Sequence, residues 1–270
     1  KAKATDGKYY LKVTATDKTG MTRVEEITIT TAAKTFDSTD KITFKSITRA
    51  PVIKWDRTSQ DNLIINLEDS NNITMVKLEK VKNGVTKFVS YKDDKNTWKA
   101  GDATISSNKK QIKISKSLLK DNAYTEFKLT TVNAKDNEMT SSFKVKLRKE
   151  KDNTKGWYEI NASPRLSFAN GLKVSVTDGG KIKTVKSQDL YNNAGTMSTG
   201  DPLSGSTDTK KIYKINLANF NDKSNMYKVR IIAQDSTGLV TQEEVTINAV
   251  KTKATTTKST SSSSSNKNST

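Results

Sequence analysis

Acidic residues in short turns are the first candidates for chemistry in this sequence. Carboxylate oxygens are the ligands that Ca²⁺ prefers in proteins. Five aspartates lie in polar turns between segments of alternating hydrophobicity: Asp17, Asp69, Asp136, Asp178 and Asp235. A dedicated calcium loop carries several acidic residues at alternating spacing, whereas a turn aspartate ordinarily accepts hydrogen bonds from its own backbone. We therefore expect structural turns and no cofactor, with calcium as the alternative that these residues leave open.

Two pairs of adjacent glutamates, Glu25-Glu26 and Glu243-Glu244, suggest paired carboxylates for acid–base catalysis. Successive residues of a β-strand point to opposite faces, so the members of such a pair cannot act on one substrate. We expect these glutamates at the surface, where substitutions change stability little. The chain contains no histidine and no cysteine, which excludes Ser-His-Asp and Cys-His nucleophiles, histidine-bound zinc and disulfides. The sequence predicts that the protein is not an enzyme.

An exposed tryptophan is a candidate for binding sugars by stacking. Trp98 lies in the polar stretch DDKNTWKAGD, residues 93–102, where we expect it to be exposed and available for ligand contact. Packing in a core or a domain interface is the commoner role of so large a side chain, and we expect that role for Trp55 and Trp157.

The segment LYNNAGTMSTGDPLSGSTDTKK, residues 190–211, shows little strand pattern over more than twenty residues. Loops of this length in a compact domain are often functional. We expect partner contacts here first, with Tyr191 and Asp201 as the candidate residues.

The formal charge of +18 comes almost wholly from lysine, because only six of the 47 basic residues are arginines. Specific nucleic-acid binding relies on arginine forks and interleaved aromatic residues, and neither clusters in this chain. The lysines predict solvated faces in loose attraction to a polyanion such as a cell-wall polymer. No apolar run approaches the roughly 20 residues that span a bilayer, so we expect no membrane-spanning segment in this fragment.

A seventeen-residue pattern occurs twice and indicates the elements that position these residues. VTATDKTGMTRVEEITI (13–29) matches IIAQDSTGLVTQEEVTI (231–247) position for position. Each copy alternates, turns at a glycine, Gly20 or Gly238, and alternates again, which is typical of a β-hairpin. A weaker third copy, VNAKDNEMTSSFKVKL (132–147), aligns with its turn one residue shorter and places Asp136 where the last copy has Asp235.

A second repeated unit precedes the hairpin in the two complete copies. LIINLEDSNNITMVK (63–77) aligns without gaps on LKVSVTDGGKIKTVK (172–186), and an opening strand led by Pro51 or Pro164 precedes each. Short strands repeating with a period of about 100–110 residues predict an all-β fold of tandem β-sandwiches. The segment 115–124 is the only helix candidate, and we interpret it as a turn.

A tyrosine leads into the first strand of each hairpin copy: Tyr9, Tyr124 and Tyr227. An immunoglobulin-type sandwich places a tyrosine at this point, where its hydroxyl bonds back to the chain. The spacing predicts a structural tyrosine corner at all three positions, with the middle copy carrying four extra residues before its turn.

The repeats predict four segments. Residues 1–33 form the closing hairpin of a truncated domain, and 37–149 and 150–250 form two complete sandwiches. Residues 251–270 consist almost entirely of Ser, Thr, Lys and Asn and form a disordered linker, because they cannot bury enough apolar surface to offset chain entropy.

The stretch YYLKVTATDKTGMTRVEEITI (9–29) resembles the closing hairpin of bacterial immunoglobulin-like repeats found in surface proteins and adhesins, and residues 226–247 are similar. The likeness covers about a quarter of the chain. It implies tandem Ig-like domains in a structural or adhesive spacer of a secreted, extracellular cell-surface protein, with a glycan, a cell-wall polyanion or a host or cell-surface protein as partner. The alternatives are a non-catalytic, carbohydrate-binding module of an extracellular glycan-degrading enzyme, and a phage tail or fibre component.

Overall fold

The computed structural model describes residues 8–16, 22–30, 41–56, 62–149, 156–169, 172–190, 197–198, 201–215, 217 and 225–252. These residues form antiparallel β-sheets. Their helical structure is limited to the 3₁₀ turn Lys116–Leu118, inside the segment expected to be a turn, and to Leu217. The predicted all-β class is confirmed. Asp17, Tyr191 and residues 253–270 of the predicted linker lie outside the described residues.

The chain divides into two compact units, Lys1–Asp40 and Lys41–Thr270. The first contains the predicted N-terminal hairpin, formed by β1 (Lys8–Thr16) and β2 (Thr22–Thr30). Its register runs from Lys8 opposite Thr30 to Thr16 opposite Thr22.

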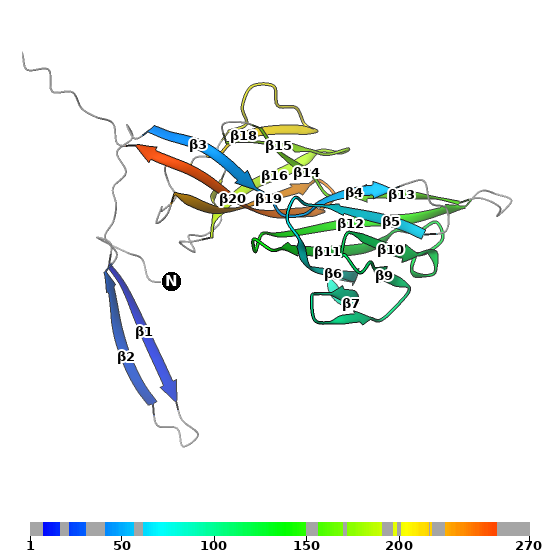
Figure 1. Ribbon diagram of the computed structural model, residues 1–270, viewed down its shortest axis with the longest axis horizontal. Helices are drawn as coiled ribbons and strands as arrows, with labels where there is room; N and C mark the ends of the chain where they lie inside the picture. Colours follow the sequence, from blue (N-terminus) through cyan, green and yellow to red (C-terminus); the bar gives the residue numbers. More distant parts are fainter. Residues whose placement is uncertain are drawn as a thin grey trace, which may run out of the picture. The chain divides into compact units, whose positions relative to one another are not determined.

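The second unit contains two hydrophobic cores, each between a part of one long sheet and a smaller sheet (Figure 1). We call the two halves the first lobe and the second lobe. The strands of the first lobe are β4 (Val52–Asp56), β5 (Asn62–Glu68), β6 (Ile73–Lys82), β7 (Val85–Lys92), β8 (Thr97–Lys99), β9 (Ala103–Ile105), β10 (Gln111–Ser115), β11 (Thr125–Asn133), β12 (Glu138–Lys149) and β13 (Gly156–Ala162). The strands of the second lobe are β3 (Lys41–Thr48), β14 (Arg165–Ala169), β15 (Lys173–Thr177), β16 (Ile182–Asp189), β17 (Met197–Ser198), β18 (Lys210–Lys214), β19 (Met226–Asp235) and β20 (Val240–Thr252).

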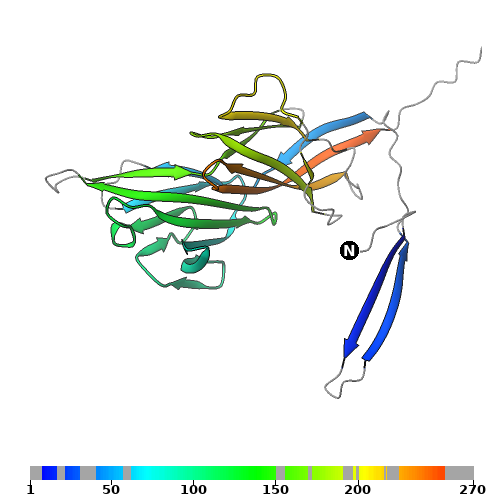
Figure 2. The ribbon, with the colours of Figure 1, turned by 180° about the vertical axis from the view of Figure 1, so that it is seen from behind.

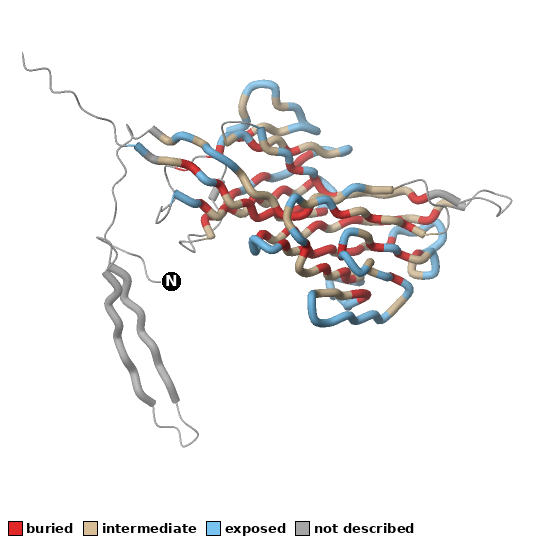
Figure 3. Tube along the Cα trace, in the orientation of Figure 1, coloured by how far each residue is buried: buried red, intermediate tan, exposed pale blue. Residues whose placement is uncertain are grey.

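The long sheet runs through both lobes in the order β17-β16-β19-β20-β12-β11-β6-β7-β8, with β13 and β3 attached to β12 and β20. The smaller sheets are β4-β5-β10-β9 in the first lobe and β14-β15-β18 in the second. Buried residues alternate along the strands that face a core, most regularly in β19 (Figure 3). This alternation is the period that the sequence showed, so local pattern and tertiary packing agree.

The two cores differ from the predicted segments by one strand each. β3 precedes the first lobe in the chain but pairs with the end of β20, and Ile42, Phe44 and Ile47 pack on the second core. β13 precedes the second lobe but folds back on β12, and Tyr158 is buried in the first core. The first lobe is thus the continuous segment 52–162, inserted between β3 and the rest of the second lobe. Figure 2 shows both pairings from behind, β3 beside β20 and β13 beside β12.

The lobes join symmetrically through the first halves of β12 and β20. Thr140 lies opposite Gln242, with Met139 opposite Glu243 on one side and Ser141 opposite Thr241 on the other. Since each of these strands is long, its first half pairs with the other lobe while its second half receives β13 or β3.

The turn between β11 and β12 differs from its expected alignment. Asn133 donates its amide to the Asn137 carbonyl, as Asp235 does to Leu239, and the Asn133 side chain accepts from the Asn137 amide as the Asp235 side chain does from Leu239. Asn133 therefore takes the place of Asp235. Asp136, with φ of 54°, takes the place of Gly238, with φ of 90°.

Candidate functional site

A groove of about 700 Å³ lies between the two smaller sheets, beneath the junction of the lobes. Its floor includes Met139, Ser141, Thr241 and Glu243 of the paired strands β12 and β20. Its walls come from β4, the start of β14 and the turn at Thr177–Gly179. The groove exists only because each smaller sheet covers its own lobe and leaves the junction between them open.

An ion pair at the edge of this groove connects β20 to the turn after β3. The Arg49 Nε and Nη2 atoms donate to the two Glu243 carboxylate oxygens at 2.8 Å each, and Nη2 also donates to the Leu166 carbonyl at 2.9 Å. The guanidinium lies 4.9 Å from the ring centroid of Phe168. Burial raises the pKa of Glu243, and the hydrogen bonds from Arg49 oppose that shift.

This geometry gives Glu243 a structural role as the ion-pair partner of Arg49, and not the role of a catalytic base. Both of its oxygens accept from Arg49, so neither is placed to take a proton from a substrate. Beside it, the Ser163 hydroxyl lies 2.9 Å from that of Ser141 and 2.6 Å from that of Thr241, so three floor hydroxyls satisfy one another. Burial also raises the pKa of Asp178 at the wall, where its carboxylate accepts from the Gly180 amide.

The expectation that both glutamates lie at the surface is wrong. Glu243 is 3% exposed and Glu244 is 7% exposed. They do point to opposite faces: Glu244 faces the other side of the long sheet, where Lys228 and Arg230 pair with it. A polar pattern at a hairpin does not reveal this burial, because the partners that cover the two carboxylates come from distant segments.

The described turn aspartates mostly bind their own backbone. Asp69 accepts from the Asn71 amide, Asp178 from the Gly180 amide, and Asp235 from the amides of Thr237 and Leu239. Asp136 is exposed in its left-handed turn. Among the described residues, no group of three acidic side chains is close enough to hold a metal ion.

Trp98 is 46% exposed and forms part of an apolar surface on the hairpin β7–β8. The Phe88 ring, 52% exposed, meets it edge to face with centroids 5.7 Å apart, and Val85 is 60% exposed. We call Phe88 and Trp98 the hairpin patch, because Val85, three residues before Phe88, lies on the opposite face of β7. Sequence analysis missed Phe88 because β7 carries a bulge at this point, where Leu78 pairs with Ser90 and Glu79 with Phe88. Trp55, by contrast, packs edge to face on Phe143 at the first core.

The three predicted corner tyrosines are not equivalent. Tyr227 is 1% exposed in the second core, whereas Tyr124 is 43% exposed, bonds to Glu159 and lies 4.5 Å from the Lys146 ammonium. The turn alignment explains the difference, because it places Thr125 of β11, which is 4% exposed, where β19 has Tyr227. Tyr9 lies in β1, and its side chain is outside the described residues.

The described part of the segment 190–211 forms a compact turn before β18. Leu203 donates its amide to the Ile212 carbonyl, and Ile212 donates its own amide to the Ser206 hydroxyl. Asp201 is exposed here and contributes, after burial, to the raised pKa of Tyr213. Asp201 and Trp98 lie in different lobes, so these two candidates do not form one site.

No protein-family model matches this chain, and no curated protein sequence is similar enough to count as a relative. Within the part of the chain that the structure describes, no helix is long and apolar enough to cross a membrane. Function must therefore be argued from the geometry.

Proposed function

We propose that this chain is a structural and adhesive part of a secreted bacterial surface protein, built from tandem Ig-like β-sandwich domains. Strand order supports the domain type. In the first lobe, β4-β5-β10-β9 and β12-β11-β6-β7 follow the A-B-E-D and G-F-C-C′ orders of an immunoglobulin-type sandwich. In the second lobe, β14-β15-β18 and β20-β19-β16-β17 follow the same orders, and the described residues of this lobe include no strand D. β3 and β13 are then additional strands placed before each sandwich.

The observation that carries the proposal is the pairing of Lys41 with Thr252. These residues begin β3 and end β20, the first and last strands that the structure describes in the second unit. The two strands therefore start and end side by side, which suits a unit that is held at one end. In Figure 1 the paired ends of β3 and β20 lie at one end of this unit, and the paired ends of β12 and β13 lie at the other. Such an arrangement suits a module that presents its distal lobe to a partner.

A projecting module must resist bending between its lobes. The long sheet continues through the β12–β20 pairing, and the Arg49–Glu243 ion pair connects the second lobe to the segment that enters the first. Asn133 and Asn137 donate from the first lobe to the carbonyls of Arg49 and Thr48. Since these contacts cross the junction, we expect the two lobes to open together.

Hydrogen exchange of the full chain tests this rigidity. Amides of β5 in the first lobe and of β19 in the second should exchange with one common opening free energy. Arg49→Ala leaves Glu243 buried without its cation, so exchange in β19 should accelerate and separate from exchange in β5.

Arg148→Ala is the matched control, because Arg148 pairs with Glu159 inside the first lobe and is itself 43% exposed. That variant should leave the two strands exchanging together. Independent opening of the lobes in the unmodified chain would contradict the proposal of a rigid projecting module.

The hairpin patch favours a second candidate, a non-catalytic carbohydrate-binding module of an extracellular glycan-degrading enzyme. Exposed aromatic rings at the distal lobe are the feature that such a module requires. Both candidates place the chain outside the cell and assign it no catalysis.

A further inference from the structure

The second layer of the fold is interrupted where the two lobes join. The long sheet is continuous through the β12–β20 pairing, whereas the layer over it ends at β4 in the first lobe and resumes at β14 in the second. Met139 and Ser141 share a face of β12 with Phe143, which is buried in the first core, so the groove floor is the core-facing side of the long sheet. The groove therefore lies where the second layer is open.

The edge of β4 faces this groove. Residues 51–55 all line it, although successive side chains of a strand point to opposite faces, so β4 presents its edge and not one of its faces. In an antiparallel pair, every second residue directs its N–H and C=O groups away from the partner strand, which here is β5. Among the described residues, no hydrogen bond joins the backbone of 52–55 to anything but β5. Such an unpaired edge is a template for another strand.

The two strands that border the groove define which side chains would fill it. In β4, Ile53 and Trp55 pack on the first core, and Lys54 between them is exposed. In β14, Leu166 is buried in the second core, and Arg165 before it is exposed. A strand that continues this layer would therefore direct apolar side chains toward the floor. Its alternate side chains would lie on the solvent side, beside Lys54 and Arg165.

The acidic residues that line the groove are engaged within the protein. Both carboxylate oxygens of Glu243 accept from Arg49, and Asp178 accepts from the Gly180 amide in its own turn. Part of the edge of β14 is engaged as well, because the Leu166 carbonyl accepts from Arg49. The open edge of β4 is therefore the one that remains for a ligand backbone.

The cations on the solvent side favour an acidic ligand. Arg165 has no ion-pair partner among the described residues, and Lys54 pairs only with the exposed Glu68, an interaction that contributes little at a surface. We propose that the groove binds an extended, acidic segment of a partner protein, which pairs as a strand with β4 and continues the second layer between the lobes.

This site goes beyond the adhesive role proposed above, because it lies at the junction of the lobes and adds a protein partner. The rigidity of the module is independent of it. If no peptide binds while the lobes still open together, the site is wrong and the module stands; independent lobes contradict the module itself.

The probe is a synthetic heptapeptide of alternating valine and glutamate, acetylated and amidated at its ends, and calorimetric titration of the full chain measures its affinity. We expect binding that weakens with added salt and is at least tenfold weaker when lysine replaces glutamate in the peptide. Bound peptide should slow amide exchange in β4 and leave β9, the other end strand of the same sheet, unchanged. Absence of binding, or equal binding of the lysine peptide, would overturn the acidic partner.

Two N-methylated forms of the peptide test strand pairing without altering the protein. One carries methyl groups on the valine amides and the other on the glutamate amides. Only one of these two sets of N–H groups can face β4, since alternate residues of a strand point their amides to opposite sides. One form should therefore bind at least tenfold more weakly than the parent peptide, and the other within threefold of it. Equal affinities of the two forms would overturn the pairing with β4.

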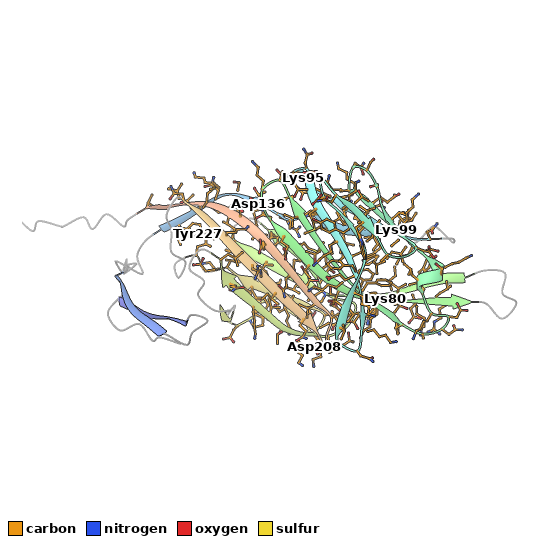
Figure 4. The ribbon with its side chains drawn as sticks, turned by 90° about the horizontal axis from the view of Figure 1, so that it is seen from below. Lys80, Lys95, Lys99, Asp136, Asp208 and Tyr227 are labelled. Atoms are coloured by element: carbon orange, nitrogen blue, oxygen red, sulfur yellow. The ribbon has the colours of Figure 1, made fainter. Side chains whose placement is uncertain are left out.

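Arg165→Glu should weaken binding of the valine–glutamate peptide at least fivefold. Lys99→Glu is the matched control, with the same change of net charge at an exposed residue of the first lobe that does not line the groove (Figure 4). It should change the affinity less than twofold, and both variants should keep the unfolding midpoint of the parent chain in urea. Equal losses in the two variants would reduce the effect to net charge and overturn the site. A dimer of the unmodified chain that the peptide dissociates, seen by sedimentation equilibrium, would assign the groove to a second copy and overturn the acidic partner.

Discussion

Truncation of Tyr227 is the sharpest test of how the second core is built. The side chain is among the largest fully buried ones and packs with Val229, Ile231 and Ile247. Removing a buried ring leaves a cavity as well as lost apolar area, so Tyr227→Ala should lower the free energy of unfolding by about 3–5 kcal/mol. Tyr227→Phe keeps the ring and removes only the hydroxyl, and should cost about 1 kcal/mol.

Tyr124→Ala distinguishes the position that the structure gives this tyrosine from the one that the sequence alignment predicts. Sequence spacing made the two tyrosines equivalent, whereas Tyr124 is 43% exposed and keeps only surface contacts with Glu159 and Lys146. We expect a loss of about 1 kcal/mol or less. The first-lobe residue at the place of Tyr227 is Thr125, which is buried.

Urea unfolding of the full chain, with far-ultraviolet circular dichroism and unchanged m values, gives these differences directly. Equal losses for Tyr227→Ala and Tyr124→Ala would refute the assignment of Thr125 as the counterpart of Tyr227. A neutral Tyr227→Ala would refute its place in the core.

Four further outcomes are expected from urea unfolding of the full chain. Arg49→Ala should lower the free energy of unfolding by about 3–5 kcal/mol, since it leaves the buried Glu243 carboxylate unpaired. A loss below about 1 kcal/mol would contradict the structural role of this ion pair. Because the pKa of Glu243 is raised in the folded state, ionisation of this carboxylate destabilises the fold. The free energy of unfolding of the parent chain, relative to that of Glu243→Gln, should therefore rise as pH falls toward about 4.5. A difference that does not change with pH would contradict the raised pKa. The lowered pKa of Asp93 has the opposite sign: its stabilisation is present above about pH 4 and should be lost as pH falls toward 2, so that the parent chain and Asp93→Asn converge. Gly238→Ala should cost about 1–2 kcal/mol from its positive φ alone, because an added Cβ meets nothing within 4 Å, and a neutral result would exclude that conformation.

Much of the secondary structure was predictable from the sequence. The hairpins 8–30 and 226–252, the strands 62–68 and 173–177, and the exposure of Trp98 all follow from alternation and from turn residues. These signals depend on neighbours within a few residues, and the repeat supplied each of them more than once. The all-β class followed for the same reason.

The candidate sites were less predictable, because they depend on pairing between distant strands. Phe88 is exposed through a bulge against β6, and Glu243 is buried by Arg49, 194 residues away. An insertion or deletion at a turn is equally hidden: Asn133 replaces Asp235 in the turn, and this shift moves Tyr124 out of the core.

What the sequence by itself determined is the set of strands, their core-facing sides and their tight turns, since hydrophobic alternation and backbone conformational preference are local properties. What only the tertiary structure decided is which strands meet. Backbone hydrogen bonds are the same for any partner, so β3 carries no local mark that assigns it to β20 instead of the lobe that follows it in the chain. The apolar face of the second core and the ion pair between Arg49 and Glu243 make that choice, and both exist only after the distant segments have come together.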